Sequence, residues 1–331
     1  MKNAVQNSVQ PSEVPIKQSP KVLNPILEFL KEQPVWIVVV GCLIFFSFLS
    51  PHFLTVQNLT NILLQSSIIG FMAIGMTYIM INGNIDLSVG ATMALAAVLV
   101  IGLQPFGLVF AIVISLLAGM AVGALNGWFV TKVGINAFVV TLGAMIGVRG
   151  LVFVYTGEQS LVGENFTFAD LGASYIGPLP LIVVIFLVTV FLGEWVLRNT
   201  PHGRNAFAVG GNYEAAVNAG IKVKKHILIN FIVIGFAAAL AGIVLASRMN
   251  AATPTLGMEY ELWVITAVVL GGTKLTGGYG SVLRTFGGIL IIGILRNGMN
   301  LLNVQAYYVL LIMGLILITV VFIDKRFGKV K

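Results

Sequence analysis

Long runs of apolar residues, separated by short polar or glycine-containing breaks, occupy most of the chain after its first 33 residues. A helix needs about 20 mostly apolar residues to cross roughly 30 Å of hydrocarbon, whereas a strand of a membrane barrel alternates apolar and polar residues over about 10 positions. The runs do not alternate, so the pattern predicts an all-α, polytopic membrane helical bundle with about ten transmembrane helices. The predicted spans are 34–50, 58–81, 88–104, 107–129, 137–155, 179–197, 226–247, 261–272, 284–302 and 306–323.

The eighth run, 261–272, is too short to cross a membrane alone. We expect it either to tilt together with its flank at Glu259 and Glu261 or to form a half-helix. The count of ten depends on which of these holds.

The composition also indicates a membrane protein, and it limits the kinds of site that the chain is expected to form. Hydrophobic residues make up 58% of the chain and charged residues only 9%, against about 25% charged in soluble domains. The single cysteine, Cys42, lies inside the first apolar run, so we predict neither a disulfide framework nor a cysteine-based metal site. His52, His202 and His226 are scattered along the sequence, which gives no indication of a metal cluster.

The two ends of the chain are polar. Residues 1–33 include Pro11, Pro15 and Pro20, and are predicted to form a disordered cytoplasmic tail. No small-residue cleavage site follows the first apolar run, so that run is predicted to be a retained span. Residues 324–331 form a predicted cytoplasmic C-tail, because an even number of spans places both ends on the same side.

The positions of the basic residues predict which end of each span faces the cytoplasm. With both tails inside, every Lys and Arg of the 19 falls in a cytoplasmic segment except Arg149, Arg248 and Arg296, as the positive-inside rule requires. Basic residues spread along membrane-facing loops do not indicate nucleic-acid binding. The external segment 156–178 contains acidic residues but no Lys or Arg, and we expect it either to receive a binding protein or to cover the bundle. The predicted location is a bacterial cytoplasmic (inner) membrane, with lipid around the spans.

The loop at 198–225 is longer than a connection between packed helices requires. Asn212 is predicted to cap a short helix at 213–218, and Gly220 to end that helix. Glycine hinges would hold this helix away from the membrane, and its alanines would allow close approach of a soluble partner. A surface loop that only covers the bundle is the alternative.

The break between the second and third spans contains Asp86, with Asn82, Asn84 and Ser88 nearby. A carboxylate costs a few kcal/mol in hydrocarbon, so Asp86 is expected to face the bundle interior or water. Two compatible interpretations remain. These groups line a solute path, or Asp86 and Ser88 cap the helix that begins near Val89.

Two arginines and three glycines lie within the predicted spans, and each is expected to affect how the helices pack. Arg149 and Arg296 are each expected to find an acceptor inside the bundle or to reach a head group, and substrate contact is the alternative. Gly119, Gly123 and Gly127 recur every four residues along the fourth span, a spacing that predicts close helix packing.

The stretches 77–91 and 266–281 align when one inserted residue is allowed, and both are predicted to join two spans at the cytoplasmic end. Transporters are often built from such repeats. Glycine-rich joints also look alike by chance, so duplication and coincidence stay equally open.

Four segments of the chain resemble segments of the ribose-type sugar permeases of ATP-binding-cassette importers, and they occur in the same order as in that family. They are TPHGRNAFAVGGNYEAAVNAGI at 200–221, NGNIDLSVG at 82–90, FVVTLGAM at 138–145, and GMEYEL at 257–262 continuing through AVVLGGTKLTGGYGS at 267–281. The chain departs from the family pattern at Asn84, Lys274 and Tyr279, which bears on the identity of the sugar more than on the transport machinery.

The resemblance implies that the chain is the permease subunit of an importer that moves a monosaccharide inward. It further implies a homodimer or a heterodimer with a sister permease, a cytoplasmic ATPase subunit and an extracytoplasmic sugar-binding protein. In this interpretation residues 34–323 form the transmembrane permease domain and 198–225 is its cytoplasmic coupling loop. The residues expected to couple to the ATPase are Gly203, Arg204, Gly210, Gly211, Asn212, Glu214, Ala215, Ala216 and Gly220. Those expected along the translocation path are Asn82, Asp86, Ser88, Thr141 and Arg149.

The sequence contains no Gly-x-x-x-x-Gly-Lys-Ser/Thr phosphate loop, and the run GGTK at 271–274 is too short to serve as one. We therefore predict that the chain is not an enzyme and binds no cofactor or metal, and that a partner hydrolyses ATP. The alternatives are an ion-driven secondary transporter and a non-transporting membrane assembly protein. An ion-driven carrier would bury titratable residues in its spans, and Asp86 is the main carboxylate candidate.

Overall fold

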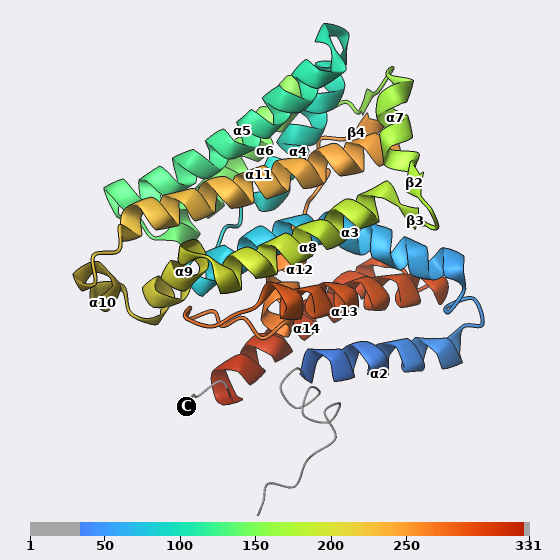
Figure 1. Ribbon diagram of the computed structural model, residues 1–331. Coiled ribbons are helices and arrows are strands. Elements are labelled where there is room, and N and C mark those ends of the chain that lie inside the picture. The colour runs from blue at the N-terminus through green and yellow to red at the C-terminus, as the bar shows by residue number, and fades with distance from the viewer. Residues whose placement is uncertain (1–33, 328–331) are drawn as a thin grey trace, which may run out of the picture.

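The computed structural model describes residues 34–327, so the predicted tail at 1–33 and residues 328–331 lie outside the described part of the chain. Most of the described residues are helical (Figure 1). The longer helices are α2 (Pro34–Leu49), α3 (Val56–Ile81), α4 (Val89–Gly102), α5 (Leu108–Trp128), α6 (Ala137–Thr156), α8 (Leu181–Asn199), α9 (Pro201–Gly211), α11 (Val223–Met249), α12 (Tyr260–Leu270), α13 (Val282–Leu301) and α14 (Ala306–Phe327). The short elements are η1 (Gln104–Phe106), η2 (Phe129–Val133), α7 (Phe166–Ala173), α10 (Tyr213–Asn218), β1 (Leu161–Val162), β2 (Tyr175–Ile176), β3 (Leu179–Pro180) and β4 (Ala251–Ala252).

Each of the ten predicted apolar runs forms a helix. Within the described residues, six helices are long and apolar enough to cross a membrane, and four apolar helices, α2, α4, α12 and the apolar part of α14, are shorter. At 1.5 Å per residue, α12 is about 17 Å long and α4 about 21 Å, less than the roughly 30 Å of a bilayer core. A half-helix at α12 was one of the two forms expected from the sequence, whereas the shortness of α4 was not expected.

Helix α3 is the most deeply buried of the six long apolar helices, and α11 packs against α3 and α4 and along α5. Glycines of α5 make this contact possible. A Cβ at Gly119 would collide with the Gly235 carbonyl, and one at Gly123 with the Phe231 carbonyl. A Cβ at Gly127 would press against Leu228. The predicted packing role of this glycine spacing is therefore confirmed.

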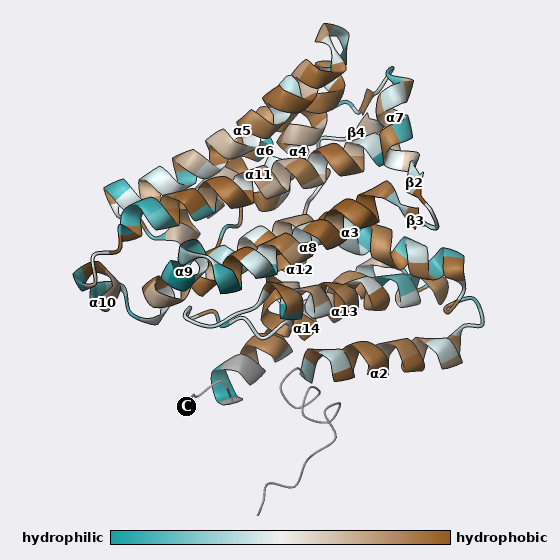
Figure 2. Cartoon of the chain, viewed as in Figure 1, coloured by the Kyte–Doolittle hydropathy of each residue, from teal (hydrophilic) through white to brown (hydrophobic). Residues whose placement is uncertain are grey.

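The two ends of the bundle carry different structures (Figure 1). One end holds α9, α10 and the loops that follow α3 and α12, and Figure 2 shows hydrophilic segments gathered around α9 and α10. At the other end lie α7 and two short antiparallel pairs, in which Leu161 pairs with Ala252 and Tyr175 with Pro180. Apolar helices connect the two ends.

The two similar stretches, 77–91 and 266–281, lie against each other at the α9 end. The Gly278 N–H donates to the Ile81 carbonyl at 2.8 Å, and Gly83, at φ +75°, lies against the Thr276 carbonyl. The loop that follows α3 and the loop that follows α12 are therefore in contact with each other.

Candidate functional site

The predicted coupling loop consists of two consecutive helices, α9 and α10, between α8 and α11. Asn212 caps α10 as predicted, because its Oδ1 accepts the Ala215 N–H at 2.9 Å. Gly220 follows α10 at φ +83°, the left-handed conformation in which glycine commonly ends a helix. The prediction missed α9, which begins with Pro201 in its first turn after the cap residue Thr200.

The glycines predicted as hinges have another role in the structure. Gly203 and Gly210 lie inside α9, where a Cβ on Gly203 would overlap the Leu197 carbonyl. A Cβ on Gly210 would overlap the Ile81 carbonyl and the Gly278 N–H, whereas Gly211 faces open space. These two glycines are therefore packing positions inside a helix rather than hinges. The missing side chain of Gly203 lets α9 rest on the end of α8, and that of Gly210 lets α9 rest on the end of α3 and on the loop after α12.

The outer surface of this segment is exposed. Arg204, Glu214 and Ala215 are exposed, and of the α10 residues Ala216 alone is buried. Tyr213 and Val217, which the sequence analysis did not single out, lie one helical turn apart and are each 47% exposed. This end therefore exposes an apolar pair on α10 as well as the charged side chains of Arg204 and Glu214.

Two of the histidines meet beside the coupling segment. His202 Nε2 of α9 lies 2.8 Å from Asn230 Oδ1 of α11, and Asn230 Nδ2 lies 3.3 Å from His226 Nε2. The two imidazole rings are 4.4 Å apart between centroids. The histidines are thus not all scattered, as the sequence suggested, because α11 returns alongside α9. Among the described residues, no group of three or more His, Cys, Asp or Glu side chains could hold a metal.

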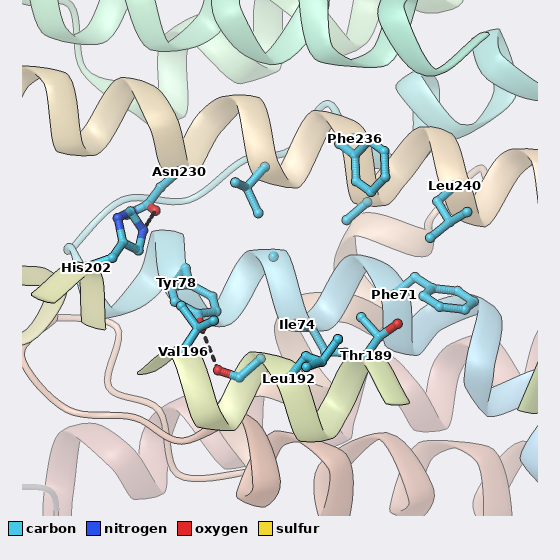
Figure 3. A pocket seen from close by; sticks show the side chains of 14 residues that line it. Phe71, Ile74, Tyr78, Thr189, Leu192, Val196, His202, Asn230, Phe236 and Leu240 are labelled. Atoms are coloured by element: carbon cyan, nitrogen blue, oxygen red, sulfur yellow. Dashed lines mark hydrogen bonds between the residues drawn. The ribbon is translucent and has the colours of Figure 1, made fainter. Parts of the chain in front are cut away.

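A pocket of about 340 Å³ lies between α3, α8 and α11 next to these histidines (Figure 3). Its polar end holds His202 and Asn230, and the Tyr78 hydroxyl there donates to the Gly193 carbonyl at 2.5 Å. The rest of the lining is mainly apolar. Sugar hydroxyls would lose their hydrogen bonds to water in such a place, so the pocket suits a hydrocarbon chain better than a sugar.

Side chains inside the bundle hold the break between α3 and α4. Asp86 Oδ1 accepts the Ser88 N–H at 2.8 Å and the Ser88 hydroxyl at 2.6 Å, and Asn126 donates to Ser88 Oγ at 2.9 Å. Asp86 and Ser88 are each only 1% exposed. Asp86 binds the N–H of Ser88, the residue before α4, and no N–H of the helix itself, whereas the Ser88 side chain makes no capping bond. The predicted capping of α4 by these two side chains is therefore wrong, and Asp86 fixes the turn that precedes the helix instead.

The remaining predicted path residues divide between two places. Asn82 Nδ2 donates to the Tyr78 carbonyl, and the Thr141 hydroxyl donates to the Ala137 carbonyl and lies 3.5 Å from the Ile85 carbonyl. The structure thus brings Asn82, Asp86, Ser88 and Thr141 to the α3–α4 break. Arg149 lies elsewhere, at the break between α11 and α12.

Arg149 of α6 holds the segment 253–259, which leads into α12. Its Nη1 donates to the Pro254 carbonyl at 2.8 Å and to the Leu256 carbonyl at 2.7 Å. Arg296 lies over the Trp263 ring, 4.1 Å from its centroid, a cation–π contact. The expectation that Arg149 finds an acceptor inside the bundle is confirmed, and Arg296 is held by an aromatic face of α12.

The amino-terminal ends of α4 and α12 meet within the bundle. A Cβ on Gly90 would collide with the Gly257 carbonyl and the Glu261 carboxylate. The residue before α12, Glu259, has φ +67°, a left-handed conformation unusual for a residue with a side chain. The sequence analysis noted Glu259 and Glu261 only as a flank, and the carboxylates beside a short apolar run were the signal available.

Sugar permeases are similar to this chain over most of its length. The ribose import permease protein RbsC of Bacillus subtilis (strain 168) is 42% identical over 285 residues, which cover 85% of this chain and 88% of the relative. The D-allose transport system permease protein AlsC of Escherichia coli (strain K12) is 38% identical over 317 residues, covering 93% and 96%. The L-arabinose ABC transporter permease protein AraH of Azospirillum brasilense is 38% identical over 297 residues, covering 87% and 86%. No solved structure matches the chain.

Residues 58–321 match the family described as "Branched-chain amino acid transport system / permease component". This match spans the bundle from α3 into α14, including α9, α10 and the short helices α4 and α12. The chain therefore belongs to this family of permease components.

Proposed function

We propose that the chain is the membrane-spanning permease subunit of an ATP-binding-cassette importer in the cytoplasmic (inner) membrane, and that it moves a monosaccharide inward. Relatives named as ribose, D-allose and L-arabinose permeases match it over most of their lengths and support this class of substrate. The chain is a transport component rather than an enzyme, and ATP is hydrolysed by a partner subunit.

Charge supports the orientation. The α9–α10 end carries Arg198, Arg204 and the lysines at 222, 224 and 225, so it belongs in the cytoplasm together with both tails. The end with α7 and the short strands then faces outward and receives a sugar-binding protein. In this arrangement α4 and α12 each cross part of the membrane, and the chain pairs with a second copy or with a sister permease.

The observation that carries the proposal is the backbone contact of α9 with Ile81 and Gly278. A partner ATPase that binds the exposed residues of α10 displaces α9. Because no side chain separates α9 from the end of α3 or the loop before α13, the displacement passes directly into the spans. Alternating access then follows as a shift between two states of the dimer. The coupling set of Gly203, Arg204, Gly210, Gly211, Asn212, Glu214, Ala215, Ala216 and Gly220 acts in this segment.

The test changes the exposed apolar pair of α10. The double variant Tyr213→Asp, Val217→Asp should insert normally, because both side chains are half exposed at the end of the bundle. We expect it to lose the co-purifying ATPase and uptake of labelled ribose, allose or arabinose by at least about tenfold, the cost of placing charges in an apolar contact. Tyr175→Asp, at the opposite end and 61% exposed, is the matched control and should keep the ATPase bound.

Retention of the ATPase by the double variant would overturn the coupling role. In the same cells, uptake by the unchanged chain should stop when ATP is depleted and continue when the proton gradient is collapsed. The opposite pattern would establish the ion-driven alternative.

A further inference from the structure

One face of α11 is basic where the helix begins and apolar further along. Residues three or four positions apart lie on the same side of a helix. Following this spacing from the residue before α11 gives Lys222, Lys225, Ile229, Val233, Phe236 and Leu240. All of these side chains are exposed or partly exposed. They are here called the α11 stripe.

The α11 stripe forms one wall of two neighbouring cavities. Its apolar part, from Val233 to Leu240, lines the pocket between α3, α8 and α11 described above (Figure 3). Its basic part and Ile229 line a second cavity of about 230 Å³, together with His202 and His226. Because His202 lines both cavities, they meet at this side chain.

The pocket is open on the side away from α3. Helix α3 packs against both α8 and α11 and forms the back of the pocket, while Leu192 of α8 and Phe236 of α11 lie on its two sides (Figure 3). Both of these side chains are exposed. In a membrane, an apolar groove with exposed apolar rims is in contact with lipid.

The length of the α11 stripe matches one leaflet of a bilayer. From Asn230, at the polar end of the pocket, to Leu240 is about 15 Å of helix at 1.5 Å per residue. Half of a hydrocarbon core of about 30 Å is also about 15 Å. Lys225 lies about 8 Å before Asn230, a distance close to the roughly 5–8 Å of the headgroup layer.

The charges of the second cavity favour an anionic head group. Its lining, all of it within the described part of the chain, includes two lysines but no Asp or Glu. Lys222 and Lys225 are exposed, and a lysine ammonium binds phosphate as a point charge with three N–H donors. A zwitterionic head group would bring its own cation next to these lysines, so an anionic phospholipid fits better.

We propose that the α11 stripe binds one anionic phospholipid of the cytoplasmic leaflet, with its phosphate at Lys222 and Lys225 and an acyl chain in the pocket between α8 and α11. The lipid then lies against the two helices that flank the coupling segment of α9 and α10. This site uses the membrane orientation proposed above and does not depend on which solute is transported.

The test measures lipid binding to the full chain purified in detergent. Native mass spectrometry gives dissociation constants for dioleoyl-phosphatidylglycerol and dioleoyl-phosphatidylcholine, which have the same acyl chains. We expect tighter binding of the phosphatidylglycerol, and Lys225→Gln should weaken it about fivefold, the contribution of one lysine near anionic lipid. Lys224→Gln is the matched control, because this neighbouring lysine is also exposed but does not line the cavity, and it should bind the lipid normally.

A second pair of variants tests the acyl-chain part of the site. Val233→Trp places a bulky side chain in the pocket and should weaken the binding of both lipids. Val113→Trp on α5 is the matched control, since Val113 is 46% exposed and Val233 is 40% exposed, and it should leave binding unchanged. Melting temperatures without added lipid should be equal for the two variants.

Equal effects of Lys225→Gln and Lys224→Gln, or tighter binding of the phosphatidylcholine, would overturn the proposal. Glycerol 3-phosphate, which has no acyl chain, should not compete at the same concentration, and competition would identify a site for free phosphate instead. In a Cys42→Ser background, oxidised Val233→Cys should stay monomeric, whereas a disulfide-linked dimer would show that a second copy covers the stripe. These measurements do not use uptake, so a failure of the proposed sugar transport leaves them interpretable.

Discussion

Two helices, α4 and α12, begin inside the bundle, yet their starting points are built in opposite ways. The start of α4 is closed: Asp86 and Ser88 are buried and hydrogen-bonded to each other and to Asn126. The start of α12 is open: Glu259 is exposed in a left-handed conformation beside Glu261. A buried, satisfied network fixes a structure, whereas an exposed carboxylate in a left-handed turn leaves the start of α12 accessible. The comparison assigns a supporting role to the first break and leaves the second break open to a partner or to solvent.

The largest effect is expected where the two breaks touch. Gly257 has φ +70° and packs on the Gly90 carbonyl, so Gly257→Ala combines a strained backbone with a collision. We expect most of the folded protein to be lost, since the left-handed conformation alone costs about 1–2 kcal/mol. The measurement is the melting temperature and yield of protein purified in detergent. Gly272→Ala, with φ +80° and open space, carries the strain alone and should lose clearly less. Equal losses would mean that the contact between the breaks is unimportant.

We expect a smaller loss of stability when the hydrogen bonds that hold the turn before α4 are removed. Asp86→Ala leaves the Ser88 N–H and hydroxyl without their acceptor inside the bundle, at a cost of about 1–3 kcal/mol. Melting temperature and yield should fall together with uptake. Asn84→Ala, which removes one 3.2 Å hydrogen bond to the Asn82 carbonyl, is the control and should change stability little. A stable but inactive Asp86→Ala protein would return Asp86 to the solute path.

The smallest expected effect is a gain in stability rather than a loss. Glu259→Gly relieves the left-handed conformation, so stability should rise by about 0.5 kcal/mol after the entropy cost of glycine is subtracted. Uptake by the same variant is measured alongside and shows whether the exposed carboxylate takes part in transport. Glu158→Gly, at φ +64° outside the two breaks, is the control for the gain in stability. Unchanged uptake with the expected gain would show that Glu259 has no part in transport.

Local signals in the sequence were sufficient to place the ten apolar helices and the cap of α10. The apolar runs identify the spans through their length alone, and Asn212 and Gly220 mark α10 through chemistry that acts within a few residues. Arg149 inside an apolar run required a partner, although the sequence could not show which carbonyls provide it.

The parts that the sequence missed depend on contacts between distant segments. The glycines of the coupling loop were expected to act as hinges, but Gly203 and Gly210 lie inside α9, where they are needed for contact with Leu197, Ile81 and Gly278. His202 and His226 meet because α11 returns past α9. The left-handed turn at Glu259, with a residue that rarely adopts it, has no signature in the sequence.

The backbone contact beneath α9 has a consequence for how such importers diversify. Main-chain atoms of Ile81, Gly210 and Gly278 are in contact, so this joint carries almost no side-chain identity to adapt to a new ATPase. The proposed coupling places that identity in the six residues of α10, of which all but Ala216 avoid burial. It therefore separates recognition of the ATPase from transmission of its movement, and it predicts that exchanging α10 alone changes which ATPase the permease binds.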